Sequence, residues 1–224
     1  MIGYLVIAHL FAGQTTFDQQ SWADLLRVDQ SGKLLCWQPM LNTPFGASLT
    51  PKQMAAERSS LVAEMMSCCH LERGELTVYG DGCGIETKLV VRKYILEFQW
   101  RVPSGGEAVV YLRGNPAIRL RDSRSRIDSD LGLGAGGLFL NQQYRAHPLI
   151  FADKQVMEWN DMRIMHKDDR VTVVLNGIKV VDSVPLEPFW QRTQAISIEG
   201  SLGVGSVRGS IQFRSMRLMK LPND

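Results

Sequence analysis

The chain has 224 residues, of which 45% are hydrophobic, and its formal net charge at neutral pH is +2. So small a net charge gives no overall attraction to nucleic acid or to an anionic membrane, and we expect neither as a partner. The hydrophobic content excludes a disordered chain, and the length fits one large β-sandwich without a second domain.

The segment from Met1 to Gly13 is apolar, but it is shorter than the roughly 18–20 residues that a membrane span needs. No Lys or Arg precedes the apolar run, so the pattern of a signal peptide is incomplete. An eroded signal sequence and a first buried strand both fit this segment. The sequence alone leaves the localisation open.

Two helices are expected in the first third of the chain. A short one spans about Gln20 to Leu26, ahead of a loop-like segment at 42–49. The second begins at Thr50-Pro51, because Thr caps a helix and Pro is tolerated at the first helical position. Apolar residues at approximately helical spacing carry it to Cys68. We interpret this helix near residues 51–68 as a surface insertion that covers one end of a sandwich.

From Gly74 onward the sequence alternates in the manner of half-buried strands. The expected strands span residues 75–79, 86–91, 93–102, 108–113, 117–121, 159–166, 170–175, 178–182, 195–198 and 211–221. Asn176-Gly177 separates two of them and predicts a two-residue hairpin, because a type I′ turn needs positive φ at both central residues. With no internal repeat and no linker, the sequence predicts one all-β sandwich domain over residues 1–224.

Four cysteines lie at Cys36, Cys68, Cys69 and Cys83. The adjacent pair Cys68-Cys69 lacks the two-residue spacer of a zinc knuckle, and no second pair completes one, so structural zinc is not expected. A chain of this length does not need disulfides, and we expect mostly free, partly buried thiols. A bridge between Cys36 and Cys83 is the alternative.

Familiar catalytic motifs find little support. Gly132 to Gly137 lacks the Lys-Ser/Thr ending of a phosphate loop, and we expect a mobile loop beside a cleft instead. The four histidines do not have metal-ligand spacing, and no Gly-x-Ser-x-Gly elbow supports a Ser-His-Asp triad. The sequence therefore leaves any metal ligands unknown.

The arginines offer a clearer candidate site. Arg119 and Arg121 share one face of an expected strand, because side chains alternate along it, and Arg113 approaches from the preceding strand. Three guanidinium groups on neighbouring strands fit either a solvated face or a cleft for an anionic or oxygen-rich ligand. Tyr111 and Trp190 would add apolar platforms for sugar rings, although a tryptophan in a sandwich is more often a core residue.

In order and spacing, the later motifs resemble the 3-keto-disaccharide hydrolase domain family. They include Tyr111-Leu-Arg-Gly114, Gly134-Ala-Gly-Gly-Leu138, Glu158-Trp159-Asn160, Val173 to Gly177 and Phe213-Arg214. The resemblance covers about residues 74–221, and residues 1–73 are left as an N-terminal strand, loops and the helical insertion. It implies the jelly-roll β-sandwich of concanavalin A-like lectins and glucanases, a carbohydrate partner, and a secreted or periplasmic location.

The chain departs from the family pattern at several polar positions. Ala117 and Arg119 stand where the family typically carries Glu or Gln, one further residue, and then Gln. Near the C-terminus, Gly205 to Arg208 replaces a Gln-x-His-Gly segment, so the histidine is missing. These departures decide whether the chemistry of the family is retained.

The resemblance implies hydrolysis of 3-keto-disaccharides. A base removes the acidified C2 proton, the enolate expels the glycosidic oxygen, and water adds to the product. Such a reaction needs a general base and a group that stabilises the oxyanion, a role that a divalent metal often fills. We expect Glu107 or Asp122 as the base, with Arg113 and Arg119 beside the enolate.

The candidate substrate-binding residues are Tyr111, Arg119, Arg121, Asn141 and Trp190. The competing interpretation is a sandwich that binds carbohydrate but has lost the chemistry, since fold does not imply function. A third interpretation is a structural or interaction domain without sugar affinity. The sequence indicates neither the identity of the sugar nor the oligomeric state.

Overall fold

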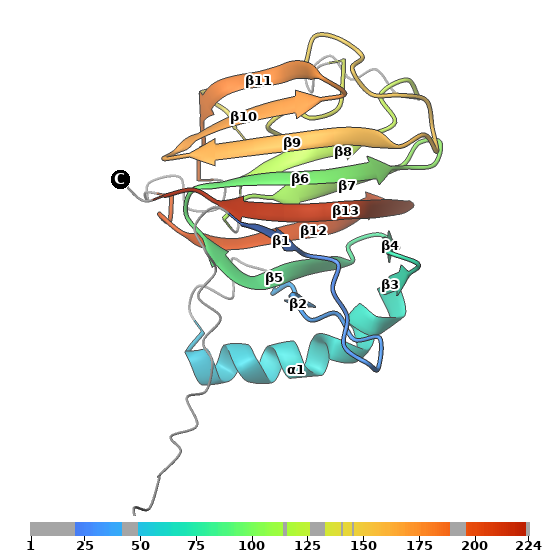
Figure 1. Cartoon of the computed structure of the whole chain (residues 1–224), viewed down its shortest axis with the longest axis vertical. Helices are drawn as coiled ribbons and strands as arrows, with labels where there is room; N and C mark the ends of the chain where they lie inside the picture. Colours follow the sequence, from blue (N-terminus) through green and yellow to red (C-terminus); the bar gives the residue numbers. More distant parts are fainter. Residues whose placement is uncertain are drawn as a thin grey trace, which may run out of the picture.

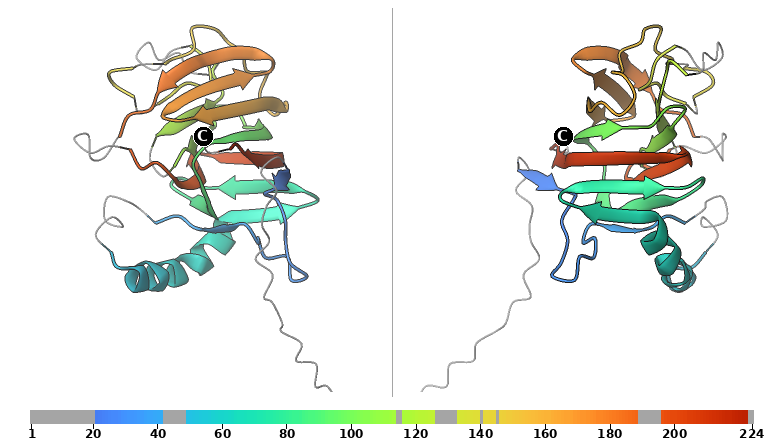
Figure 2. Two further views of the ribbon diagram at one scale, coloured as in Figure 1. Left: turned by 60° about the vertical axis from the view of Figure 1, so that its left-hand side comes forward. Right: turned by 90° about the vertical axis from the view of Figure 1, so that its right-hand side faces the viewer.

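The computed structural model describes residues 21–41, 49–113, 116–125, 133–139, 141–144, 146–188 and 196–222. Two antiparallel sheets pack face to face as a sandwich, and one helix, α1 (Pro51–Cys68), lies across one end (Figures 1 and 2). The expected jelly-roll β-sandwich with a helical insertion is confirmed. Within the described ranges, no helix is long and apolar enough to cross a membrane.

The larger sheet joins strands from distant parts of the sequence. In spatial order its strands are β11 (Ile178–Pro185), β10 (Arg170–Leu175), β9 (Asn160–Lys167), β6 (Tyr94–Arg101), β13 (Ser210–Lys220), β4 (Glu75–Tyr79) and β3 (Cys69–Glu72), with β1 (Trp22–Asp24) paired to β13. The last strand of the chain thus lies between β6 and β4. The central pairings of this sheet therefore cannot form until the C-terminal strand has been synthesised.

The smaller sheet has five strands. Their spatial order is β2 (Trp37–Pro39), β5 (Gly84–Val91), β12 (Gly200–Arg208), β7 (Glu107–Tyr111) and β8 (Ala117–Arg121). One face of this sheet packs on the larger sheet, and the other faces outward. The outward face carries the candidate site.

Burial alternates along the strands as a sandwich requires. In β9, every second side chain from Asn160 onward is buried and every other one is exposed. The largest side chains buried between the sheets include Trp37, Tyr94, Trp100 and Phe213. Burying a side chain of this size contributes about 1.5–3 kcal/mol, so the interface between the sheets is the main source of stability.

The helix α1 begins at the residue that the sequence predicts. The Thr50 hydroxyl accepts a hydrogen bond from the Gln53 N–H, and the Gln53 side chain accepts one from the Thr50 N–H, which completes a capping box. No side chain of α1 is buried, so the helix adds little to the core. Its position therefore depends on contacts at a few points.

Two contacts fasten α1 to the smaller sheet. Arg58 forms an ion pair with Glu86 on β5, and a disulfide joins Cys68, at the end of α1, to Cys83, just before β5. The prediction of mostly free thiols is therefore wrong for these two cysteines. The alternative bridge from Cys36 to Cys83 is also wrong, because Cys36 is free and half-buried, whereas Cys69 is free and buried. The turn that follows β4 returns Cys83 to α1, and the sequence spacing could not show this proximity.

Some predicted elements are also wrong. Over 22–24 the chain forms β1 on the edge of β13 in place of the helix expected at Gln20–Leu26. Residues 196–198 lie outside any strand, and the strand expected there begins at Gly200 as β12. Glycines weaken the strand signal of β12, and the short β2 and β3 were not anticipated at all. The apolar segment Met1–Gly13 lies outside the described residues.

The expected mobile glycine loop is closely packed from Leu133 onward. A Cβ on Gly134 would lie 2.1 Å from the Ile150 carbonyl oxygen, and one on Gly137 would lie 2.6 Å from Pro148 Cδ. Gly136 and Gly137 exchange backbone hydrogen bonds with Arg119 on β8. Glycine is required here because the backbone approaches its neighbours closely, and the segment covers the β8 edge.

The hairpin between β10 and β11 forms as the sequence predicts. Asn176 has φ of 50° and Gly177 has φ of 81°, the two positive values of a type I′ turn. The Asn176 side chain also accepts a hydrogen bond from the Asp161 N–H and donates to the Ala152 carbonyl. The turn thus joins the β10–β11 hairpin to β9.

We expect Gly177→Ala to lower the free energy of unfolding by about 1 kcal/mol, because an added Cβ is strained at positive φ. No neighbour lies within 4 Å of that Cβ, so the effect isolates the backbone conformation. Chemical denaturation measures it, with the exposed Lys179→Ala in the same hairpin as the control. Equal stability of the Gly177→Ala variant and wild type would contradict the assignment of this turn.

Candidate functional site

One row of residues crosses the outward face of the smaller sheet. Strand pairing places Gln38 opposite Glu86, Glu86 opposite Gly203, Gly203 opposite Tyr111, and Tyr111 opposite Ala117. The row arises because the neighbouring positions along these strands point inward to the core. It brings a carboxylate and an aromatic ring to the same face.

Tyr111 lies across the glycines of β12. A Cβ on Gly203 would lie 3.2 Å from Tyr111 Cδ2, and one on Gly205 would lie 3.5 Å from Tyr111 Cε2. The half-buried ring therefore occupies the space that side chains on β12 would fill. Burial raises the pKa of Tyr111, so its hydroxyl stays protonated at neutral pH. The result is an aromatic ring beside the glycines of the sheet, with a neutral polar tip.

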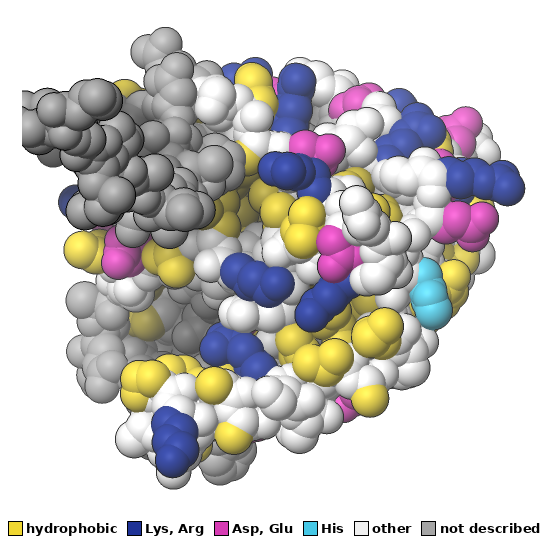
Figure 3. All heavy atoms as spheres, turned by 60° about the horizontal axis from the view of Figure 1, so that its bottom comes forward, with side chains coloured by type: hydrophobic (Ala, Val, Ile, Leu, Met, Phe, Trp, Pro, Cys, Tyr) yellow, Lys and Arg dark blue, Asp and Glu magenta, His cyan; other side chains and the backbone are white. Residues whose placement is uncertain are grey.

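A hollow of about 470 Å³ opens between this surface and α1. Its floor includes Gly84, Gly205 and Tyr111, and α1 contributes the carboxylates Glu57 and Glu64 along with apolar groups. Figure 3 views the α1 end of the molecule, where hydrophobic and basic side chains are interspersed. The hollow thus combines an aromatic surface, a glycine floor and acidic groups.

Beside the hollow, Glu86 is held by several donors. It accepts hydrogen bonds from the Ser201 hydroxyl at 2.8 Å and from the Gln38 amide at 3.4 Å, and it pairs with Arg58 of α1. This carboxylate positions the helix over the sheet. The sequence analysis missed Glu86 and the acidic residues of α1; the one available signal was Glu86 on the polar face of an alternating strand.

Glu107 and Arg119 form a buried ion pair farther along the same face. Arg119 Nε donates to Glu107 Oε1 at 2.7 Å, and both side chains are almost fully buried. The guanidinium also lies over the Phe139 ring, 5.4 Å from its centroid. Neither residue lines the hollow under α1. The expected base and one expected enolate-stabilising group therefore bind each other.

Other expected site residues hold loops in place. The Asp122 carboxylate accepts hydrogen bonds from the Gly105 and Arg124 N–H groups. Arg121 donates to the Leu133 carbonyl, and the buried Asn141 amide donates to the Tyr144 and Pro185 carbonyls. Trp190 lies outside the described residues. Of the described candidates, the structure brings Tyr111 alone to the hollow.

Arg113 contacts other groups than the Glu107–Arg119 pair. It lies two residues past the end of β7, in a turn, with a φ of 48°. Its guanidinium donates to the Ile198 carbonyl at 2.9 Å, and it is buried near Tyr94 and His166, whose rings stack at 5.2 Å. Arg113 and Arg119 are thus not brought together at one oxyanion position.

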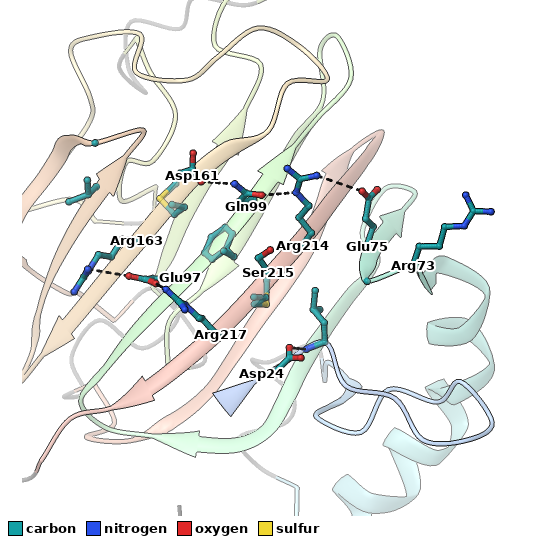
Figure 4. Close-up of a pocket in the computed structure, with 17 residues that line it drawn as sticks. Asp24, Arg73, Glu75, Glu97, Gln99, Asp161, Arg163, Arg214, Ser215 and Arg217 are labelled. Atoms are coloured by element: carbon teal, nitrogen blue, oxygen red, sulfur yellow. Dashed lines mark hydrogen bonds and ion pairs between the residues drawn. The ribbon is translucent and has the colours of Figure 1, made fainter. Parts of the chain in front are cut away.

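A second hollow of about 810 Å³ lies on the outer face of the larger sheet (Figure 4). Most of its charged groups are paired: Glu97 with Arg163 and Arg217, Glu75 with Arg214, and Asp161 with Lys154. Trp159 lies nearby, and Arg101 and Arg214 each contact its ring. These groups satisfy each other, so this hollow is the weaker candidate for a ligand site.

The divalent metal that the expected chemistry often uses does not fit the expected site. Such a cation prefers several oxygen ligands, whereas Glu107 and Asp122 are committed to Arg119 and to backbone N–H groups. Across the described part of the chain, the one close group of three potential ligands is Cys68, Cys69 and Cys83. That group consists of sulfur and not of oxygen.

The two packed antiparallel sheets define a concanavalin A-like jelly-roll β-sandwich. Residues 37–219 match the model of the 3-keto-alpha-glucoside-1,2-lyase-like domain. The chain belongs to this family. No curated protein matches the chain in sequence.

Two crystal structures of candidate glycosyl hydrolases from Parabacteroides distasonis ATCC 8503 are similar to the chain. One is 15% identical with a TM-score of 0.57, and the similarity covers 69% of this chain and 84% of that one. The other is 16% identical with a TM-score of 0.54, covering 83% of this chain and 99% of that one. At these identities the likeness shows a shared fold.

We expect Glu107→Leu and Arg119→Met each to lower the free energy of unfolding by about 3 kcal/mol, because each leaves a buried charge without its partner. The double variant should cost less than the sum of the single variants, since it removes both charges. Chemical denaturation of all four proteins gives the coupling energy. If the stability losses of the two single variants simply add in the double variant, the ion pair between Glu107 and Arg119 is contradicted.

Burial, assisted by the nearby Arg113, lowers the pKa of His166 to about 4, whereas an unfolded chain has a value near 6.5. Between these values the unfolded state binds a proton that the folded state does not. We therefore expect the free energy of unfolding to fall by roughly 3 kcal/mol as the pH drops from 6.5 to 4. His166→Phe should flatten this part of the profile.

Denaturation at several pH values in this window measures the effect. His70→Gln is the control, because His70 is exposed and should keep the wild-type slope. The account of His166 fails if His166→Phe loses as much stability in acid as wild type does.

Proposed function

We propose that the chain is a carbohydrate-binding member of its family, which receives a sugar ring in the hollow between α1 and the smaller sheet. The observation that carries this proposal is the Tyr111 ring, which lies against the glycines of β12 and lines the hollow. Sugar rings present apolar C–H faces that stack on aromatic side chains. A hollow of about 470 Å³ lies within the range of small-ligand pockets, on the order of 300–1,000 Å³.

The polar groups around Tyr111 suit sugar hydroxyls. Glu57 and Glu64 present carboxylate acceptors from α1, and the protonated Tyr111 hydroxyl supplies a donor. A ring stacked on Tyr111 would therefore meet hydrogen-bond partners on the helix side of the hollow. This arrangement uses residues that are not engaged in the Glu107–Arg119 pair.

Binding is favoured over elimination because the groups expected to act on the C2 proton are engaged in contacts within the protein. Glu107 is paired with Arg119, and the Arg113 guanidinium donates to the Ile198 carbonyl beyond the end of β7. Ala117 adds no polar group where the family pattern has one. A base must lie within hydrogen-bond reach of the proton that it removes.

The match to lyase-like domains supports a second candidate, cleavage of 3-keto-glucosides by C2 deprotonation. In that case the base would be Glu57 or Glu64, the carboxylates that line the hollow. A Glu57→Gln/Glu64→Gln variant would then lose turnover. Under the first proposal no turnover exists to be lost.

We expect Tyr111→Ala to weaken binding of a glucoside or a 3-keto-glucoside about tenfold, which corresponds to about 1.4 kcal/mol of lost stacking. Tyr144→Ala is the matched control, because Tyr144 is an exposed tyrosine away from the hollow. Calorimetric titration with a panel of keto and unoxidised disaccharides measures the affinity. Release of 3-ketoglucose, with and without EDTA, is followed in parallel.

The outcomes separate the candidates. Saturable binding without release supports a binding protein, and release that Glu57→Gln/Glu64→Gln abolishes supports the lyase. Equal affinities of Tyr111→Ala and wild type would remove Tyr111 from the site. A folded wild type without affinity for any sugar of the panel would contradict both candidates.

A further inference from the structure

Three cysteine sulfurs meet beside the hollow. Cys68 and Cys83 are joined as a disulfide, and the free Cys69 Sγ lies 3.5 Å from Cys83 Sγ and 4.0 Å from Cys68 Sγ. The three arrive from different elements: Cys68 ends α1, Cys69 begins β3, and Cys83 precedes β5. The sandwich therefore builds a sulfur cluster that the sequence spacing did not indicate.

We infer that reduction of the Cys68–Cys83 disulfide turns Cys68, Cys69 and Cys83 into a three-thiolate site for a soft metal ion, with Cu(I) as its best occupant. The three potential ligand atoms lie within 4.8 Å of one another. A metal with bonds of about 2.3 Å to sulfur holds its ligand sulfurs about 3.8–4.0 Å apart in tetrahedral or trigonal geometry. The two non-bonded separations, 3.5 and 4.0 Å, are close to this value.

The surroundings favour a soft ion over a hard one. Within the described residues, no histidine or carboxylate belongs to the group of close ligands. The thioethers Met40 and Met65 line the same hollow as Cys68 and Cys83, and Met65 precedes Cys68 by three residues on one helical face. Thiolate and thioether ligands select Cu(I) over Mg²⁺ or Ca²⁺.

The site has an entry path and a defined reaction. Cys68 and Cys83 line the hollow, so an ion reaches them from solvent, whereas Cys69 is buried behind them. Reduction by two equivalents of a small thiol delivers two electrons and two protons, and it yields two cysteine thiols and one small-molecule disulfide. Binding of Cu(I) by all three cysteines then releases three protons.

Metal binding should be pH-dependent. Apparent affinity should therefore rise with pH over the neutral range, because each ligand must lose a proton to bind. The oxidised protein keeps two of the three sulfurs in the disulfide and should not form this site.

The test titrates Cu(I) into reduced full-length protein without oxygen, in competition with a chromophoric Cu(I) chelator. We expect one tightly bound Cu(I) per chain, and a loss on the order of 100-fold or more in affinity for Cys69→Ser, because losing a ligand costs more than losing a supporting contact. Cys36→Ser is the control, since Cys36 is a free thiol outside the cluster. It should bind Cu(I) as wild type does.

Several results would overturn the inference. They are equal affinities of Cys69→Ser and wild type, a loss on Cys36→Ser, tight binding by the oxidised protein, or binding of Zn²⁺ without binding of Cu(I). If Cys69→Ser does not fold, X-ray absorption of the Cu(I)-loaded wild type decides by counting sulfur neighbours. Three or more sulfurs support the site, and two or fewer refute it.

Discussion

The register of the smaller sheet governs the candidate site. Strand side chains alternate, so a register that buries Val110, Ile118 and Val204 in the core must turn Tyr111, Ala117 and Gly203 outward. A shift of one residue on β7 would send Tyr111 into the core and expose its apolar neighbours. The packing between the sheets thus determines which side chains form the surface of the candidate site.

The glycines of β12 complete this surface. They weaken the strand on their own, but they leave the space in which Tyr111 and Met40 lie against the sheet. With side chains at Gly203 and Gly205, the ring would be lifted away and the hollow would be filled. The low strand propensity of these glycines thus accompanies the space that the Tyr111 ring occupies.

Local patterns in the sequence predicted the elements whose signals are local. The Thr50-Pro51 cap, the Asn176-Gly177 turn and most of the alternating strands after Gly74 formed as expected. The misses have a common physical cause. β1, β12 and the Cys68–Cys83 bridge depend on partners that are remote in sequence, and no local pattern reports them.

The same distinction holds for the site. Arg119 and Arg121 do share a face of β8, yet Glu107 neutralises Arg119, and the Leu133 carbonyl accepts from Arg121. Charged residues next to a family motif were expected to act on a substrate. In the structure they instead bind other groups of the protein at the edge of the smaller sheet. The motif made Tyr111 a candidate, and the structure places it in the lining of the hollow. The acidic residues of α1 carry no motif and line the hollow through the tertiary fold.

The helix α1 is the wall of the hollow that is held by the fewest contacts described above. It buries no side chain, and the Arg58–Glu86 pair and the Cys68–Cys83 bridge fasten it to the sheet. One wall of the hollow thus depends on an ion pair and on the redox state of two cysteines. The proposed sugar site and the proposed metal site thus share a wall of the hollow without sharing ligands.

A crystal structure of the protein soaked with a glucoside or 3-keto-glucoside would test the central claim most directly. The account predicts a sugar ring stacked on Tyr111, with hydroxyl groups directed toward α1. A ring bound instead on the outer face of the larger sheet, beside Trp159, would contradict it.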